Sequence, residues 1–342
     1  RLGSDGRGTL SSMLREYLIS EAMHALGVPT TRALAVISTG RPIQRGHVQP
    51  AGIVVRVAAS HIRVGTFHLA AQTDYTRQLA DYAIARHYPG SDYQEFFTQV
   101  MDTQIRTVSQ WMRLGFIHGV MNTDNTTISG ETIDYGPCAF MEVYSPDTVF
   151  SSIDRQGRYA FGNQPSILGW NLARLAESLL PLFDMDMNKA MDFAQETINS
   201  YTDRFEHHRN KDLARALDTS LEIASSYSAA MQLNGPDITL AHRALADAAA
   251  GHPTPARELL PEGDFVDEYL TSSPDPSRVD SAMPRVIPRN LAVEAVLSSA
   301  ERGEMGPFRE ILHAVTHPWY PHPSFEAPDP LGLKGYLTYC GT

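Results

Sequence analysis

The residues best suited to chemistry lie in one short stretch, His118-Gly-Val-Met-Asn-Thr-Asp124-Asn125, which is followed nine residues later by Asp134-Tyr135-Gly136. A magnesium-bound nucleotide needs a carboxylate and a neutral amide oxygen facing the metal, and a second carboxylate that orients or deprotonates the attacking hydroxyl. Asp134, Asn125 and Asp124 supply these three groups. The stretch therefore predicts a magnesium–nucleotide site.

The position of the acid separates this loop from that of an ordinary kinase. In small-molecule kinases of the kinase-like fold, the loop reads His-Gly-Asp-x-x-x-x-Asn, where the Asp is the base and the Asn binds the metal. Asn125 is in register with that Asn, but Val120 occupies the position of the base and cannot accept a proton. The only carboxylate in the loop is Asp124. We therefore expect a different reaction on a kinase scaffold.

Further motifs follow one another in a fixed order along most of the chain. They are Ser4-Asp-Gly-Arg7, Leu14-Arg-Glu16, Ser20-Glu-Ala-Met23, Gly27-Val-Pro-Thr-Thr-Arg-Ala-Leu34, Arg56-Val-Ala-Ala-Ser60-His-Ile-Arg63, Met121-Asn-Thr-Asp-Asn125, Thr132-Ile-Asp-Tyr-Gly-Pro137, Gly157-Arg-Tyr-Ala-Phe161, Asn163-Gln-Pro165, Trp170-Asn-Leu172, Pro288-Arg-Asn290 and Cys340-Gly-Thr342. With these motifs the sequence resembles the selenoprotein O family of kinase-like protein adenylyltransferases. The resemblance implies an α+β, protein-kinase-like two-lobe fold with a mostly helical large lobe.

The resemblance also implies AMP transfer, linked to redox homeostasis. It implies that a Ser, Thr or Tyr hydroxyl of a protein substrate attacks the α-phosphorus of ATP, which is held flipped together with Mg²⁺ or Mn²⁺. An ordinary kinase and a catalytically silent nucleotide-binding or partner-binding protein remain the alternatives. Carried over position by position, the resemblance makes Asp124 the catalytic base, Asn125 and Asp134 the metal ligands, and Asp5, Gly6, Glu16, Arg56, Arg63 and Asp134 the nucleotide-binding residues.

Each of these residues also has a plainer interpretation. Asp and Asn commonly occupy turns because of their local hydrogen bonds, which applies to the loop residues and to Asp5-Gly6. Arg56 and Arg63 could be surface arginines on a strand edge, and Glu16 a solvated helix residue. Arginine nevertheless suits phosphate, because its planar fork binds oxygens in pairs and stays charged. His118 is expected to hold the loop backbone rather than to transfer protons.

One element of the family pattern is absent. In the family, a phosphate-binding lysine that pairs with the helix glutamate lies shortly before the Asp-Gly-Arg motif, and a glycine-rich segment lies earlier still. The 342 residues begin at Arg1 and contain neither. We expect a fragment that lacks the first part of the small lobe and is inactive without it. A natural remnant that has lost part of its ATP site is the alternative.

Composition narrows the choice of partners. The net charge of −11, from 28 basic and 39 acidic residues, argues against nucleic acid or an anionic membrane as a partner. No run reaches the roughly 18 apolar residues of a membrane helix.

Cys138 and Cys340 suggest neither a disulfide framework nor a zinc site, although a link between the two remains possible. The expected compartment is the cytoplasm in a bacterium, with mitochondria possible in a eukaryote.

Periodicity outlines the elements that must position the site. It predicts a helix over residues 9–27, strands over 33–38 and 53–57, and a long helix that begins with a capping box at Ser91 and Gln94 and ends near Gly115. Short strands over 126–128 and 131–134 should flank the turn at Ser129-Gly130. Helices are expected at 168–179, 187–205 and 290–302, with a linker at 271–290 and an extended tail at the end.

These elements group into three expected parts: residues 1–70 as the remainder of the nucleotide-binding small lobe, 71–235 as the catalytic helical lobe, and 236–342 as a helical extension with a Pro-rich tail. His313, His317 and His322 lie in that tail without metal-ligand spacing, so no metal is assigned to them.

Overall fold

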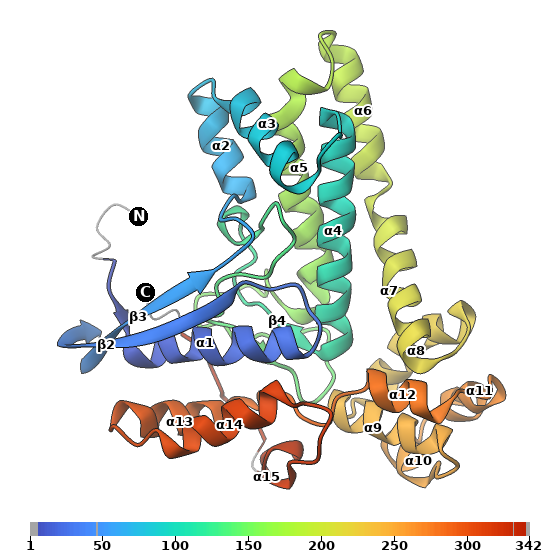
Figure 1. Ribbon diagram of the computed structural model, residues 1–342. Helices are drawn as coiled ribbons and strands as arrows, with labels where there is room; N and C mark the ends of the chain where they lie inside the picture. The colour runs from blue at the N-terminus through green and yellow to red at the C-terminus, as the bar shows by residue number, and fades with distance from the viewer. Residues whose placement is uncertain (1–5, 46, 331, 340–342) are drawn as a thin grey trace.

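The computed structural model describes residues 6–45, 47–330 and 332–339. A small antiparallel sheet with one long helix beneath it forms the N-terminal end, and a much larger helical part rises beside it (Figure 1). This arrangement confirms the expected α+β class. Asp5 and Cys340, which carry two of the predictions made above, lie outside the described residues.

The sheet consists of β1 (Gly8–Thr9), β2 (Arg32–Arg45) and β3 (His47–Val57), in the order β1-β3-β2 with antiparallel neighbours. Both predicted strands lie in it, but β2 and β3 are longer than predicted. An irregularity between Ser38 and Pro42 accommodates Gly40, which has a φ of 68°, and Pro42 then pairs opposite Pro50. The ladder therefore continues past residues that usually end a strand.

Helix α1 (Leu10–Ala25) carries one of the predicted site residues and is packed on two sides. The Thr9 side chain caps its start by accepting the Ser12 N–H at 3.1 Å, and Gly27 follows its end with a φ of 78°. One side of α1 contacts β2 and β3, and the other contacts α13 (Asn290–Glu301) and α14 (Gly306–Thr316) (Figure 1). The C-terminal helices thus form the floor beneath α1.

The helical part begins with α2 (Val64–Gln72), α3 (Thr76–His87) and the 22-residue α4 (Tyr93–Leu114). The predicted long helix is confirmed, and Gly115 ends it with a φ of 71°. The predicted capping box is wrong by one residue. Asp92 accepts the Glu95 N–H at 2.8 Å, and the Glu95 carboxylate accepts the Asp92 N–H at 3.1 Å. A carboxylate at each position gives charge-assisted bonds that serine and glutamine would not.

Eight more helices lie between α4 and α13. They are α5 (Gln164–Phe183), α6 (Met187–Asn199), α7 (Tyr201–Leu217), α8 (Leu221–Asn234), α9 (Ile238–Ala249), α10 (Thr254–Leu259), α11 (Phe265–Thr271) and α12 (Pro276–Ala282). The helix predicted over 187–205 is divided at Ser200, where α6 ends and α7 begins. Helix α12 lies within the predicted linker, and α14 and α15 (Pro323–Glu326) lie within the predicted extended tail.

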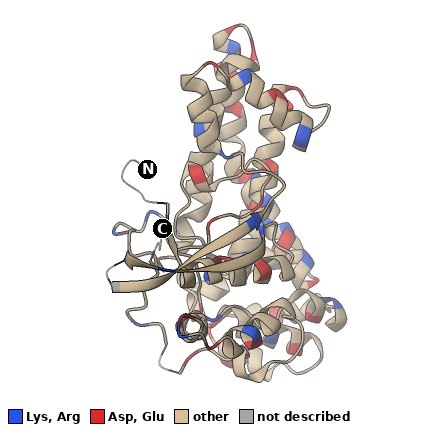
Figure 2. Cartoon of the chain, turned by 60° about the vertical axis from the view of Figure 1, so that its left-hand side comes forward, with Lys and Arg blue, Asp and Glu red and all other residues tan. Residues whose placement is uncertain are grey.

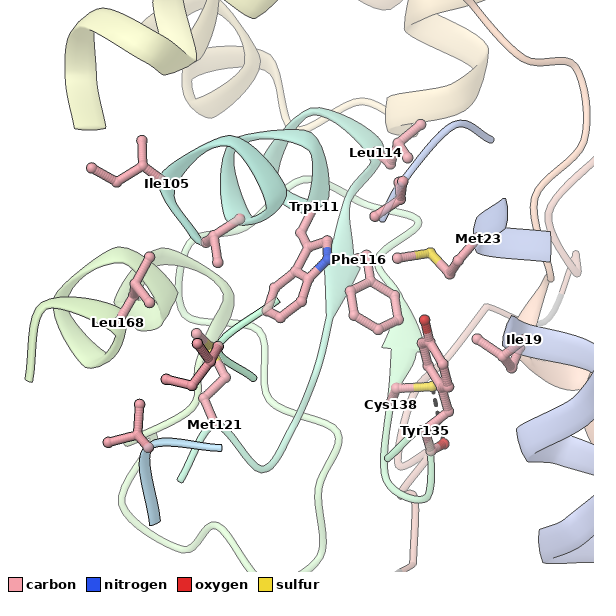
Figure 3. Close-up of a cluster of buried hydrophobic side chains, with 14 of the residues drawn as sticks. Ile19, Met23, Ile105, Trp111, Leu114, Phe116, Met121, Tyr135, Cys138 and Leu168 are labelled. Atoms are coloured by element: carbon pink, nitrogen blue, oxygen red, sulfur yellow. Dashed lines mark hydrogen bonds between the residues drawn. The ribbon is translucent and has the colours of Figure 1, made fainter. Parts of the chain in front are cut away.

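Buried apolar side chains form two clusters. The first joins α1, α4, α5, α13 and α14, and the second joins α7 to α12 with Ile117, Met141 and Phe161. In the first cluster Phe116 packs edge-on against Trp111, with ring centroids 5.4 Å apart, and against Tyr135 at 6.0 Å (Figure 3). Burying an aromatic side chain of this size contributes on the order of 2 kcal/mol, so the start of the predicted metal loop is part of the main core.

The short segments after α4 bring the loop residues into place. They are β4 (Phe116–Ile117), paired with β5 (Ala139–Phe140), and the 3-10 turns η1 (Thr123–Asn125) and η2 (Phe161–Asn163). The strands expected over 126–128 and 131–134 do not form a hairpin. Thr127 instead bridges to Arg63, and Thr132 bridges to Thr30. Each half of the turn thus satisfies backbone groups by pairing with a segment next to the small sheet.

Charged residues are distributed over the whole molecule. Figure 2 shows Lys, Arg, Asp and Glu interspersed along the helices rather than gathered into one large basic face. Across residues 6–45, 47–330 and 332–339, no helix is both long enough and apolar enough to cross a membrane.

Candidate functional site

His118 holds the backbone of the loop, as expected. Its Nε2 bonds to the Ile133 carbonyl at 2.9 Å, and its Nδ1 accepts the Val120 N–H at 3.3 Å. The side chain is fully buried beside Trp111, and burial lowers the pKa of the imidazole below its usual range. A neutral ring with both nitrogens occupied fixes the two halves of the site relative to each other.

Asn125 and Asp134 lie side by side. The Asn125 Nδ2 donates to Asp134 Oδ2 at 2.9 Å and to the Val120 carbonyl at 3.0 Å. Both amide hydrogens are therefore used, which leaves the Asn125 Oδ1 as the free ligand atom beside the carboxylate. Asp134 has a φ of 69°, in the left-handed region that non-glycine residues seldom adopt. Such a conformation persists only where the surrounding structure holds it, which is common at functional sites.

This donor set fits magnesium bound through a nucleotide. In the described part of the chain, no group of three His, Cys, Asp or Glu side chains is placed to enclose a metal ion. Magnesium prefers oxygen ligands and usually takes one or two from the protein, with waters and substrate phosphates completing its octahedron. Asn125 Oδ1 and the Asp134 carboxylate offer two such oxygens.

Asp124 lies in η1, and its N–H donates to Asn122 Oδ1 at 2.9 Å. The residue is exposed, and its carboxylate lies against Gly65 in the first turn of α2. A Cβ atom on Gly65 would stand 2.1 Å from Asp124 Oδ1, so a larger residue at position 65 would force this carboxylate to move. The N-terminal end of a helix also favours a negative charge. The Asp124 carboxylate thus lies against the start of α2 and remains open to solvent.

Glu16 connects α1 to both the sheet and the metal loop. Its Oε1 pairs with the Arg56 guanidinium, and its Oε2 accepts the Tyr135 N–H at 2.7 Å. The residue is buried. Tyr135 directly follows Asp134, so one carboxylate ties β3 to the residue next to the proposed metal ligand. In the described structure the partner of Glu16 is Arg56, one of the two arginines predicted to bind phosphate.

Arg63 precedes α2 and forms a backbone bridge to Thr127. The Nε atoms of Arg56 and Arg63 are both buried without a hydrogen-bond partner, but so are those of Arg15, Arg174, Arg209, Arg243 and Arg289, so this feature does not mark a phosphate contact. Gly6, predicted to contact the nucleotide, is exposed just before β1 and has a φ of 66°. The structure therefore brings Glu16 and Arg56 together with the metal loop.

A cavity of about 770 Å³ opens beside Gly136. Sequence reasoning missed the residues that line it from the C-terminal end, because nothing in a local pattern shows that the end of the chain returns to α1. The cavity is lined by Thr9, Ser11, Ser12, Arg15, Arg45, Gln49, Gly136, Glu294, Leu297, Tyr336, Leu337 and Tyr339. Arg15 could have been singled out, since it stands next to Glu16 within a recognised motif.

The α+β fold and the Asn125–Asp134 pair with Asp124 beside it in the chain fit one class of protein, the nucleotide-dependent transferases. The chain belongs to a particular family within that class, because the family model described as protein adenylyltransferase SelO matches residues 1–238. The resemblance recognised in the sequence is confirmed. Membership implies a nucleotide substrate and divalent-metal chemistry.

Curated relatives agree with this assignment. A protein nucleotidyltransferase YdiU from Corynebacterium efficiens is 49% identical over 99% of this chain and 73% of the relative. Proteins of the same name from Mycolicibacterium paratuberculosis and Cereibacter sphaeroides are 46% and 48% identical, again over 99% of this chain, and over 75% and 76% of the relatives. The chain thus spans about three quarters of each relative's length.

Proposed function

We propose that this protein transfers AMP from ATP to Ser, Thr or Tyr hydroxyls of protein substrates, with Mg²⁺ or Mn²⁺ as the metal. The observation that carries the proposal is the position of Asp124. The loop has an apolar residue where a kinase has its base, and its one carboxylate lies against Gly65, immediately before the Asn–Asp pair. The acceptor hydroxyl would then approach from the α2 side, and the family match to a protein adenylyltransferase supports attack on the α-phosphorus.

In this proposal the fold is kinase-like. The sheet and α1 belong to the small lobe, residues 71–235 form the catalytic helical lobe, and residues 236–342 form a C-terminal extension. The nucleotide would lie between the sheet and the metal loop, where Glu16 already joins Arg56 to Tyr135. Asp5 and Gly6 would contact it from the segment before β1.

Each side chain then has a role in the reaction. Asp124 accepts the proton of the attacking hydroxyl as its oxygen bonds to the α-phosphorus, and the bond from that phosphorus to pyrophosphate breaks. Asn125 and Asp134 would hold the metal ion, which supplies charge neutralisation for the phosphates. Arg56 and Arg63 add fixed positive charge where negative charge develops, and preorganised groups of this kind usually give the largest single contribution to catalysis.

Two forms of labelled ATP test the proposal, with the protein expressed from its complete reading frame. Label from the α-phosphate should appear on protein and label from the γ-phosphate should not. Asp124→Ala should lower transfer at least 100-fold, since general bases contribute about 10²–10⁴-fold. Asp134→Ala should remove metal-dependent nucleotide binding. Asp192→Ala, at an exposed position on α6, is the matched control and should behave as wild type.

The results separate the proposal from its rivals. Transfer of the γ label to protein would identify a kinase and overturn AMP transfer. No transfer of either label, together with no thermal shift on addition of ATP and Mg²⁺, would identify a silent binding protein. Full transfer by Asp124→Ala would refute the choice of base.

A further inference from the structure

Residues 336–339, here called the C-terminal strap, cross the segment that follows Asp134. Thr338 is its most heavily bonded residue. The Thr338 Oγ1 donates to the Pro137 carbonyl at 2.7 Å, its N–H donates to the Phe150 carbonyl at 2.7 Å, and its carbonyl accepts the Ser152 N–H at 2.9 Å. The residue is only 2% exposed. One threonine therefore joins the two ends of the segment 137–152.

Tyr336 anchors the other end of the strap. Its hydroxyl donates to Glu294 of α13 at 2.8 Å and accepts from Arg15 at 3.4 Å. Arg15 in turn donates to the Cys138 carbonyl at 2.8 Å. The Tyr336 ring packs edge-on against Phe150, with centroids 5.6 Å apart. Through Arg15, Tyr336 is thus also connected to the Cys138 carbonyl, which follows that of Pro137 in the chain.

These contacts bear on Asp134 because of its backbone conformation. Its left-handed φ has to be held from both sides. On the N-terminal side His118 fixes the Ile133 carbonyl. On the C-terminal side Glu16 holds the Tyr135 N–H and the Cys138 thiol donates to the Tyr135 carbonyl, and farther along Thr338 and Arg15 hold the carbonyls of Pro137 and Cys138.

The Pro137 carbonyl also touches the catalytic loop. A Cβ atom on Gly119 would stand 2.6 Å from that oxygen, so the carbonyl fills the space that glycine leaves in the loop. The Thr338 hydroxyl donates its hydrogen bond to the same oxygen. A shift of the strap would therefore be transmitted to the loop that carries Asn125 as well as to Asp134.

We propose that Thr338 and Tyr336 are positioning residues for the metal-nucleotide site, and that they act through the backbone of residues 136–138 on Asp134. The inference rests on the proposed function for its catalytic readout. Its structural content is independent of that function: the C-terminal strap sets the geometry of a metal ligand located about 200 residues earlier in the chain.

Thr338→Val tests the hydroxyl alone, because valine has the same shape and keeps the backbone bonds to Phe150 and Ser152. The apparent KM for ATP with Mg²⁺ should rise and kcat should fall, lowering kcat/KM about tenfold, as expected for an unsatisfied buried acceptor. Thr338→Ser restores the hydroxyl and should return kcat/KM to within about twofold. Thr316→Val removes a threonine hydroxyl bond inside α14 and should leave both constants unchanged.

Tyr336→Phe tests the second anchor, since it removes the hydroxyl and keeps the ring on Phe150. It should weaken the site in the same direction, and combining it with Thr338→Val should have a larger effect than either change alone. Tyr320→Phe, at a residue 66% exposed, is the control. Hydrogen exchange in residues 136–152 should quicken in both strap variants by more than it does in the rest of the protein.

The outcomes decide whether Thr338 and Tyr336 position the metal-nucleotide site or only stabilise the fold. Wild-type exchange rates and wild-type nucleotide affinity in Thr338→Val would overturn the inference. A uniform loss of stability that Thr338→Ser fails to rescue would also overturn it. If wild-type protein transfers no AMP, the proposed function fails on its own, while the exchange rates and the ATP–Mg²⁺ thermal shift still test the strap.

Discussion

Gly65→Ala should damage catalysis without damaging the fold. The new methyl group would stand 2.1 Å from Asp124 Oδ1 and 3.2 Å from its Cγ, so the carboxylate must move by more than about 1 Å to reach an ordinary van der Waals separation. A misplacement of about 1 Å can cost roughly 100-fold in rate, which corresponds to about 2.7 kcal/mol in the barrier. We therefore expect kcat to fall about 100-fold.

The same change should leave stability unaltered or slightly raised. Gly65 lies in α2 without a left-handed φ, where alanine is favoured over glycine by up to about 1 kcal/mol. The measurements are AMP transfer at saturating ATP and a thermal melt. Gly306→Ala, in the first turn of α14 with no atom within 4 Å of the new Cβ, is the matched control. Wild-type transfer by Gly65→Ala would refute the catalytic role given to the observed Asp124 position.

Three further outcomes can be checked. Glu16→Ala should lower the free energy of unfolding by about 2 kcal/mol, because it leaves the Tyr135 N–H and the Arg56 guanidinium without their partner; equal urea midpoints would contradict this. Burial lowers the pKa of His242 to about 3. On acidification this imidazole therefore takes up a proton at a higher pH in the unfolded chain than in the folded one. Stability from this group is complete above pH ~6.5 and falls by about 1.4 kcal/mol per pH unit below it. His242→Gln should flatten that slope between pH 6.5 and 5, and an unchanged slope would place the dependence elsewhere. Burial raises the pKa of the Cys138 thiol to about 12, so iodoacetamide at pH 8 should label Cys138 only after denaturation, as read by peptide mass spectrometry; rapid labelling of native protein would show that the thiol is accessible.

The proximity of Asn125 and Asp134 could be predicted from the sequence because the two residues belong to motifs that lie a short distance apart in the chain. Asn125 and Asp134 are nine positions apart and end side by side, and the periodic helices α1 and α4 occur where their apolar positions recur. Local pattern was sufficient where each residue's partner lies in the same element or in a recognised motif.

Long-range partners could not be predicted in this way. The segments 126–128 and 131–134 have the composition of a hairpin, yet each finds a backbone partner next to the small sheet instead. Asp92 caps α4 in place of Ser91. Asp and Ser stabilise a helix N-terminus by similar free energies, so the sequence does not show which of the two is the cap. The partner of Glu16 lies 40 residues away in β3, and the strap returns from the far end of the chain.

The floor beneath α1 has a consequence for how this family can vary in length. α1 carries Glu16 toward the metal loop on one side and rests on α13 and α14 on the other, so these two helices support the helix that carries Glu16. A deletion there would remove the support of the nucleotide-binding end. Insertions and deletions should instead be tolerated among α8 to α12, whose side chains belong largely to the second core.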